Sequence, residues 1–219
     1  MQHANVILLA LTLFCIRLTG LQAQTMTDAD GNVYPAITIG KQVWMAENLK
    51  TSRFNDGKPI QLVTDNNIWK ALKIPAYCWL NNDIANKDVY GALYNWFTVN
   101  TNKLCSKGWH VPTNTEWGAM ITFLGDENTA GSKLKETGSD HWKNSLIIAT
   151  NDFDFTALPA GMRYDSGTFP IFANNYAVWW SATGSNPDAW NRGLFFSSSR
   201  TFKGHENVRS GFSVRCIRD

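Results

Sequence analysis

The clearest pattern of apolar and polar positions lies between Cys105 and Gly125. Thr113 and Glu116 stand at the spacing of a capping box, in which the threonine hydroxyl and the glutamate carboxylate each accept from the other residue's backbone N–H. Gly125 follows the last apolar residue of the pattern, where helices commonly end. We therefore predict a short helix from Thr115 to Leu124, entered from an extended arm. Its apolar face has the i, i+3, i+4, i+7 spacing and consists of Trp117, Met120, Ile121 and Leu124.

Turn residues divide the rest of the chain into short elements. Extended segments at 34–39 and 42–47 flank Gly40-Lys41 and predict a hairpin near the end of the chain or at the edge of its sheet. In the middle of the chain we expect a strand at 76–79 and helices at 66–73, 89–100 and 130–136. Strands separated by glycine or Asn/Asp turns are expected at 161–164, 168–172, 177–181, 189–197, 200–203 and 211–218.

The order of these elements indicates a fold class. Helices fall in the middle of the chain and strands at its two ends, which is typical of α+β domains with a mostly antiparallel sheet. We expect that sheet to be small, twisted and rich in loops.

Residues 1–23 have the character of a secretory signal peptide. The apolar run at 6–16 is too short to span a bilayer, and Ala23 offers a small residue for cleavage. No later stretch is apolar and long enough to be a membrane helix. We expect an exported protein, extracellular, on the cell surface or periplasmic, with residues 24–219 as a single domain.

Charge and aromatic content narrow the partners. The leader contains one of the 20 Lys and Arg and none of the 18 Asp and Glu, so the mature chain has 19 against 18, or +1. A nucleic-acid partner would favour a basic surface, so we expect none. Ten Trp, twelve Phe and six Tyr can fill a core or line a carbohydrate site, and composition does not separate the two uses.

The mature chain has three cysteines, Cys78, Cys105 and Cys216. In an exported protein two of them are expected to pair, which leaves one thiol. The residues alone allow three pairings.

Several segments together resemble the Fibrobacter succinogenes major paralogous domain, in the order that the family has them. They span almost the whole mature chain and are Ile39–Leu49, Tyr90–Trp96, Gly108–Thr113, Glu116-Trp117, Ala157–Gly161, Trp179–Thr183 and Gly211–Cys216. The family occurs in bacterial exported and surface proteins and is largely without an assigned biochemical function. It is more distantly similar to formylglycine-generating, sulfatase-modifying enzymes and other C-type-lectin-like domains.

The resemblance implies a C-type-lectin-like fold, with two main helices packed on a small twisted sheet and the termini brought together. It also implies a disulfide between Cys105 and Cys216. Some family members have a further cysteine after the Tyr-Cys-Trp segment, where this chain has 86–88, so Cys78 is expected to be a buried free thiol.

Catalytic patterns are weak in this sequence. Formylglycine-generating enzymes use paired cysteines near the end of the fold, whereas this chain offers only Cys216 there. His110, His141 and His205 have no metal-ligand spacing, so no metal set is indicated. Serine-hydrolase and phosphate-loop motifs are absent from the sequence as well. We expect no catalytic residues, and an oxidase-like relative of the formylglycine-generating enzymes is the alternative.

Binding patterns are stronger in the last third of the chain. Asn186, Asp188, Trp190 and Asn191 lie around a proline turn and offer oxygen donors and an aromatic ring, which suit Ca²⁺ or a sugar. An ordinary turn is the interpretation that we favour over a Ca²⁺ site. The acidic loop at 81–88 has the same two interpretations.

The pair Trp179-Trp180 offers another surface. If both lie in a strand, their rings point to opposite faces. We expect one ring in the core and the other, at Trp180, to be exposed as a stacking platform.

Three functions fit these patterns. The first is a secreted or surface-displayed, non-catalytic module that recognises or scaffolds a glycan or a protein. The second is an enzyme related to formylglycine-generating proteins, and the third is a purely structural part of a surface assembly.

Overall fold

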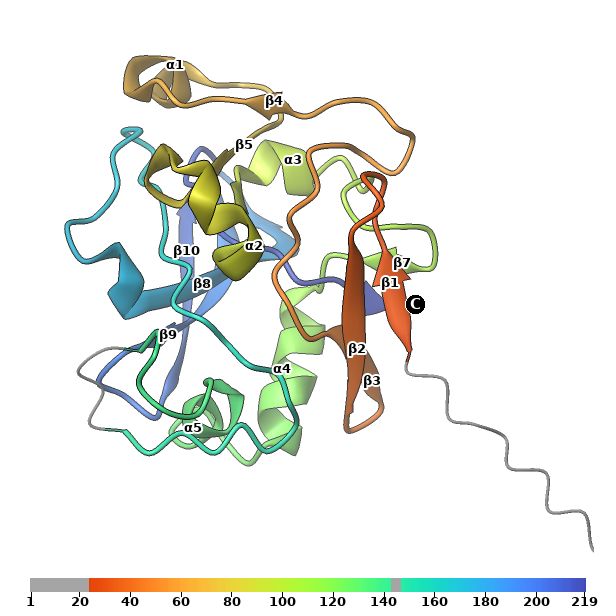
Figure 1. Ribbon diagram of the computed structural model, residues 1–219, viewed down its shortest axis with the longest axis vertical. Coiled ribbons are helices and arrows are strands. Elements are labelled where there is room, and N and C mark those ends of the chain that lie inside the picture. The colour runs from red at the N-terminus through yellow and green to blue at the C-terminus, as the bar shows by residue number, and fades with distance from the viewer. Residues whose placement is uncertain (1–23, 143–146) are drawn as a thin grey trace, which may run out of the picture.

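The computed structural model describes residues 24–142 and 147–219. The signal peptide expected at 1–23 lies outside these residues. The described chain is a mixed α and β fold, built mostly from small antiparallel sheets with a few short helices (Figure 1). None of the helices in the described ranges has the length and apolar character needed to cross a membrane.

The first sheet brings together the two ends of the domain. Its five strands pair antiparallel in the order β1-β2-β3-β11-β7. They are β1 (Thr25–Thr27), β2 (Val33–Ile39), β3 (Gln42–Met45), β7 (Trp109–His110) and β11 (Ile217–Arg218). The predicted hairpin is confirmed as β2 and β3, with Ile39 opposite Gln42. It lies beside the last strand, and the C-terminus is next to β1 in Figure 1, where Arg218 Nη1 donates to Gln24 Oε1 at 2.9 Å.

Two three-stranded sheets complete the β structure. One is an antiparallel meander in the order β10-β9-β8, and the other, in the order β4-β5-β6, contains a parallel pair between β4 and β5. Their strands are β4 (Gln61–Leu62), β5 (Ala76–Trp79), β6 (Ala92–Tyr94), β8 (Tyr176–Ser185), β9 (Asp188–Phe195) and β10 (Thr201–Asn207). Strands expected at 161–164 and 168–172 are wrong: this region makes only isolated bridges, Gly161 to Ala177 and Arg163 to Gly211.

The helices are α1 (Asn66–Ala71), α2 (Lys87–Tyr90), α3 (Trp96–Val99), α4 (Asn114–Phe123) and α5 (Ala130–Leu134). Three-residue 3₁₀ turns are η1 (Leu80–Asn82), η2 (Ile84–Asn86) and η3 (Ala173–Asn175). Helix α4 confirms the predicted central helix. Its capping box is formed, since Thr113 Oγ1 accepts from the Glu116 N–H at 3.2 Å and Glu116 Oε2 accepts from the Thr113 N–H at 2.7 Å.

The helix expected over 89–100 is wrong, and so is the expectation of two main helices. Gly91 has a φ of +74° and ends α2, after which the chain enters β6 and pairs with β5. Asn95 then caps a separate helix, α3, by accepting from the Thr98 N–H at 3.1 Å. The apolar spacing was compatible with a helix, but pairing with β5 decided the conformation. In the described chain, α4 is the one helix that reaches ten residues.

Helix α4 lies between the first sheet and the β8–β10 sheet (Figure 1). Its buried Trp117 packs on Trp44 of β3, with ring centroids 4.7 Å apart, and on Trp179 of β8 at 5.9 Å. Phe155 completes this aromatic cluster. Much of the aromatic content therefore fills the core.

A disulfide joins the arm before α4 to the residue that directly precedes the last strand, β11. Cys105 and Cys216 are bonded, with Cα atoms 6.0 Å apart, as the family resemblance implied. The Cys216 carbonyl also accepts from the Met45 N–H at 3.0 Å. The disulfide is consistent with export.

Candidate functional site

The residues predicted from the proline turn come from one hairpin. Asn186 and Asp188 lie at the turn between β8 and β9, where Asn186 is exposed and Asp188 is half-buried. Trp190, further along β9, is opposite His205 of β10, and the two rings meet edge to face at 5.5 Å. His205 Nδ1 lies 3.4 Å from Asp188 Oδ2.

The Trp190 ring is also close to a cation, because Lys203 Nζ lies 5.1 Å from its centroid. The hairpin therefore groups Asp188 and Trp190 with two side chains that sequence reasoning missed, Lys203 and His205. The strand register would have revealed these two residues. Strand β10 runs to Asn207, four residues beyond its predicted end, and places both side chains beside Trp190.

Two predicted binding residues are not surface groups. Trp180 is fully buried, packs on Phe212 at 4.3 Å and donates from Nε1 to the Tyr94 carbonyl at 2.8 Å. Asn191, its partner in the strand register, is only 2% exposed. The expected stacking platform at Trp180 is wrong because both faces of β8 are covered at Trp179 and Trp180. Trp179 and Trp180 do point to opposite faces, but each ring enters a different part of the core.

The acidic loop at 81–88 does not converge on one point. Asp83 Oδ1 accepts from the Ala85 N–H at 2.9 Å, whereas Asp88 pairs with Lys50. Among residues 24–142 and 147–219, no three His, Cys, Asp or Glu side chains gather in a way that would hold a metal ion.

A pocket of about 510 Å³, which sequence reasoning did not predict, opens between the segment after β3, the end of α2 and the segment after Phe155. We call it the Arg215 pocket. It is lined by Pro35, Ala46, Glu47, Asn48, Lys50, Asp88, Val89, Gly91, Thr156, Leu158 and Arg215. Glu47 to Leu49 and Arg215-Cys216 belong to segments that carry the family resemblance, but nothing in their spacing along the chain brings them together.

Asn48 organises the floor of the Arg215 pocket. Its Oδ1 accepts from Trp179 Nε1 at 2.8 Å and from Arg215 Nε at 3.0 Å. Its Nδ2 donates to the Tyr90 carbonyl at 2.9 Å. With both ends of the amide bonded, the side chain is held in one orientation.

Arg215 is a buried cation in this floor. Its guanidinium lies 4.0 Å from the centroid of the Phe155 ring and donates to the carbonyls of Phe155 and Thr156. Burial lowers the pKa of Arg215 to about 9, which still leaves it protonated at neutral pH. No carboxylate of the described residues forms an ion pair with it.

Opposite charges meet at the rim. Lys50 Nζ lies 3.2 Å from Asp88 Oδ1, and the lysine side chain is 18% exposed whereas the aspartate is 82% exposed. Glu47 is exposed on the same pocket. The rim therefore presents Lys50, which is fixed by its ion pair, and the two solvent-exposed carboxylates of Glu47 and Asp88.

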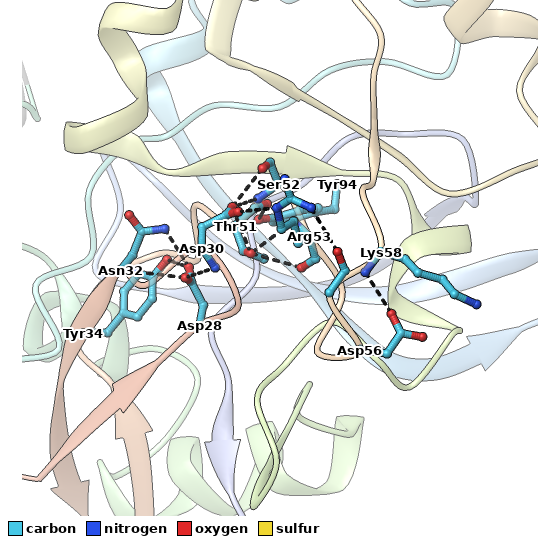
Figure 2. Close-up of polar contacts among 11 residues, drawn as sticks. Asp28, Asp30, Asn32, Tyr34, Thr51, Ser52, Arg53, Asp56, Lys58 and Tyr94 are labelled. Atoms are coloured by element: carbon cyan, nitrogen blue, oxygen red, sulfur yellow. Dashed lines mark hydrogen bonds and ion pairs between the residues drawn. The ribbon is translucent and has the colours of Figure 1, made fainter.

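A polar network that includes Asp28 and Tyr34 (Figure 2) holds the backbone of Lys50 in place. Asp28 Oδ2 accepts from the Tyr34 hydroxyl at 2.5 Å, and the Tyr34 oxygen accepts from the Lys50 N–H at 3.0 Å. Burial and the bond to Asp28 raise the pKa of Tyr34, so its hydroxyl stays protonated and donates. Asp28 also accepts hydrogen bonds from the backbone N–H groups of Asp30 and Asn32 at 2.9 Å, which closes the turn between β1 and β2.

The same network continues beyond Lys50 (Figure 2). Asp30 Oδ2 accepts from the Ser52 N–H at 2.5 Å, and Arg53 Nε lies 3.2 Å from Asp30 Oδ1. Burial acts to raise the pKa of Asp30, but these bonds and the Arg53 charge outweigh it and lower the pKa. The Tyr94 hydroxyl donates to the Thr51 carbonyl at 2.7 Å. Both sides of the segment that bears Lys50 are thus tied to the core.

The chemistry of the Arg215 pocket is that of charge pairing and hydrogen bonding. Its lining contains two cations, two carboxylates, an amide and the Thr156 hydroxyl, and it contains no thiol and no imidazole. The cysteines lie elsewhere: Cys78 is a fully buried free thiol whose pKa burial raises to about 12, and Cys216 is in the disulfide.

Comparison with known proteins gives a family and no individual relative. No curated protein and no solved structure matches the chain. The model of the Fibrobacter succinogenes major domain matches residues 37–218, which include the β8–β9 hairpin and ten of the eleven residues that line the Arg215 pocket. Because this match covers most of the chain, the protein belongs to the Fibrobacter succinogenes major domain family.

Proposed function

We propose that this protein is a secreted or cell-surface, non-catalytic module that recognises a ligand, either a glycan or a surface protein. The observation that carries the proposal is the Arg215 pocket, in which charged and polar groups converge and are held by hydrogen bonds before any ligand arrives. A site fixed in this way loses little conformational entropy on binding. Its volume is in the range typical of small-ligand sites, about 300–1,000 Å³.

The composition of the pocket favours recognition over catalysis. Formylglycine-generating chemistry needs accessible thiolates. Here Cys216 is bonded to Cys105, and Cys78 is buried with a raised pKa. Neither residue lines the Arg215 pocket.

We also propose that the fold is C-type-lectin-like. The meeting of the first and last strands in one sheet, and a disulfide that joins the residue directly before the last strand to the arm before α4, support this assignment. A crystal structure of residues 24–219 that superposes poorly on lectin-like domains would contradict it.

The function is tested by screening residues 24–219 on a glycan array, with and without Ca²⁺. We expect binding to a defined group of glycans. Two variants separate the candidate sites: Lys50→Gln alters the Arg215 pocket, and Trp190→Ala alters the β9–β10 surface. Loss of binding with Lys50→Gln alone assigns the site to the pocket, and loss with Trp190→Ala alone moves it to the hairpin. Absence of binding both with and without Ca²⁺ argues against a glycan ligand. The proposed function then requires that the wild type captures a surface protein and that Lys50→Gln does not.

A further inference from the structure

The Arg215 pocket contains a buried positive charge that makes no direct ion pair with a carboxylate of the described residues, and only the more distant Glu47 on the same lining acts on it through space. The partners of the Arg215 guanidinium are the amide oxygen of Asn48 and the carbonyls of Phe155 and Thr156, all of them uncharged. A buried charge is costly unless it is paired. The Phe155 and Trp179 rings, at 4.0 and 5.7 Å from the guanidinium, stabilise a cation but carry no net charge.

The guanidinium also retains hydrogen-bonding capacity. Arginine has five N–H groups, and the bonds within the described part of the chain use three of them. Arg163, the other fully buried arginine, makes four such bonds, to Gly167, Val63, Thr64 and Asn66. Arg215 therefore has donors for an additional acceptor, and although it is only 1% exposed it forms part of the lining of the pocket.

Lys50 supplies a second cation on the same pocket. It is largely covered, and its backbone N–H is bound by Tyr34. Its carboxylate partner Asp88 is largely exposed, so an incoming carboxylate can take the place of Asp88 at little cost.

The remaining lining indicates what surrounds that carboxylate. The exposed carboxylate of Glu47 accepts hydrogen bonds, so it suits a ligand that carries hydroxyl groups. The apolar lining is aliphatic, with Pro35, Val89 and Leu158, and no aromatic ring lines the pocket for stacking on a neutral sugar.

We infer that the Arg215 pocket binds the carboxylate of an acidic sugar of the uronic acid class, with Arg215 and Lys50 facing the carboxylate, Asp88 displaced from Lys50, and Glu47 facing hydroxyl groups. This inference rests on the proposed function and names the class of its ligand.

The probes are D-glucuronate and D-glucuronamide, which differ only in that a neutral carboxamide replaces the charged carboxylate. Titration of ¹⁵N-labelled residues 24–219 followed by NMR gives both affinities and the residues that respond. We expect D-glucuronate to bind at least about tenfold more tightly than D-glucuronamide, because a charge-assisted bond is roughly twice as strong as a neutral one. The shifted amides are expected to include Asn48, Val89, Gly91 and Thr156. Equal affinity for the two probes, or shifts confined to the β9–β10 hairpin, would overturn the inference.

Two variants with opposite expected effects guard against simple misfolding. Lys50→Gln should weaken glucuronate binding by at least about tenfold, with Lys107→Gln, an exposed lysine in the loop before β7, as the matched control. Asp88→Asn should strengthen binding, because it removes the competing carboxylate, and Asp152→Asn on an exposed loop is its control. A gain of affinity cannot come from loss of structure. Weaker binding by Asp88→Asn would contradict the assigned geometry.

A third probe, propionate, tests the sugar part of the inference. Propionate is expected to bind at least about tenfold more weakly than D-glucuronate, since it lacks hydroxyl groups for Glu47. Equal binding would show that the hydroxyl contacts are wrong. If the glycan array shows binding only to neutral glycans, the uronic acid inference fails while the proposed recognition function stands.

Discussion

Asn48 and Arg215 are 167 positions apart in the chain, yet Asn48 Oδ1 accepts a 3.0 Å hydrogen bond from Arg215 Nε. The same oxygen accepts from Trp179 Nε1 at 2.8 Å. One amide thus joins the segment after β3, the strand β8 and the segment before β11. This contact places a cation in the floor of the Arg215 pocket and ties that pocket to the aromatic core.

Replacing Asn48 should be among the more costly single changes outside the apolar core. Asn48→Ala leaves two buried donors, on Trp179 and Arg215, without their acceptor, and each such loss costs about 1–3 kcal/mol. We expect the free energy of unfolding in urea to fall by about 3 kcal/mol. Asn67→Ala, on the exposed side of α1, is the control and should change it by less than about 0.5 kcal/mol. Similar values for the two variants would show that the Asn48 contacts are not structurally important.

Gly91 should tolerate no side chain. A Cβ there would lie 2.8 Å from Asn48 Cβ and 2.9 Å from the Leu49 carbonyl oxygen, and φ is +74°. Gly57 has a similar φ of +82° but open space around its Cβ position. Gly57→Ala therefore measures the free-energy cost of the backbone conformation without a steric clash. We expect Gly91→Ala to be more destabilising than Gly57→Ala by about 1–3 kcal/mol in urea unfolding. Equal losses would mean that only the backbone conformation matters.

The disulfide should contribute strongly to stability because it closes a long loop. Cys105 and Cys216 are 111 positions apart, and the chain-entropy model gives about 4–5 kcal/mol for a loop of this size. The double variant Cys105→Ala/Cys216→Ala is expected to lose about that much in urea unfolding. Peptide mapping of the oxidised wild type should find this one bridge, and a bridge to Cys78 would refute the pairing.

Cys78 should be inert in the folded protein. It is fully buried, and burial raises its pKa to about 12, so at pH 8 it is neither accessible nor ionised. Iodoacetamide is expected to leave the native protein unmodified and to add one group after unfolding in guanidinium, as measured by intact mass. Fast modification under native conditions would show that β5 opens readily.

His110 should give the stability a pH dependence near neutrality. Burial acts to lower its pKa, but hydrogen bonds to Asp219 at 2.6 Å and Glu116 at 2.8 Å outweigh burial and raise it above 6.5. A raised pKa in the folded state stabilises fully below the unfolded value, and the stabilisation is lost as the pH rises through the folded value. The wild type should therefore exceed His110→Gln in stability by more at pH 6 than at pH 9.

The histidine can also be followed directly by NMR. Asp219→Asn removes one of its two carboxylate partners, so the pKa of His110 should fall relative to the wild type. An unchanged titration curve would assign the shift to Glu116 alone.

Local interactions explain what could be predicted. The capping box joins Thr113 and Glu116, which are three positions apart, and the apolar face of α4 repeats within seven positions. The sequence displays both patterns directly. The hairpin of β2 and β3 follows in the same way from Gly40, whose φ is +62°. The pairing of Cys105 with Cys216 came from family resemblance, since spacing left three choices.

Long-range pairing explains what could not be predicted. The apolar residues of the segment at 89–100 have helical spacing. In the structure, however, α2 ends before Gly91, and the next residues pair with β5 as strand β6. The alternation of side chains along a strand predicts which rings share a face of the sheet, but it does not predict whether that face is covered. The expectation that Trp180 is exposed was therefore wrong. Both faces of β8 are covered, and only the packed sheets decide this.

The amino-acid sequence by itself determined the family, the central helix with its cap, the first hairpin and the α+β character, because these depend on neighbours in the chain or on segments in a fixed order. Only the tertiary structure decided which polar residues meet. Asn48, Lys50, Asp88 and Arg215 come from three distant segments, and no periodicity links them. Their meeting depends on the burial of the aromatic core between the sheets, which fixes where each backbone segment emerges and which charges remain without a partner.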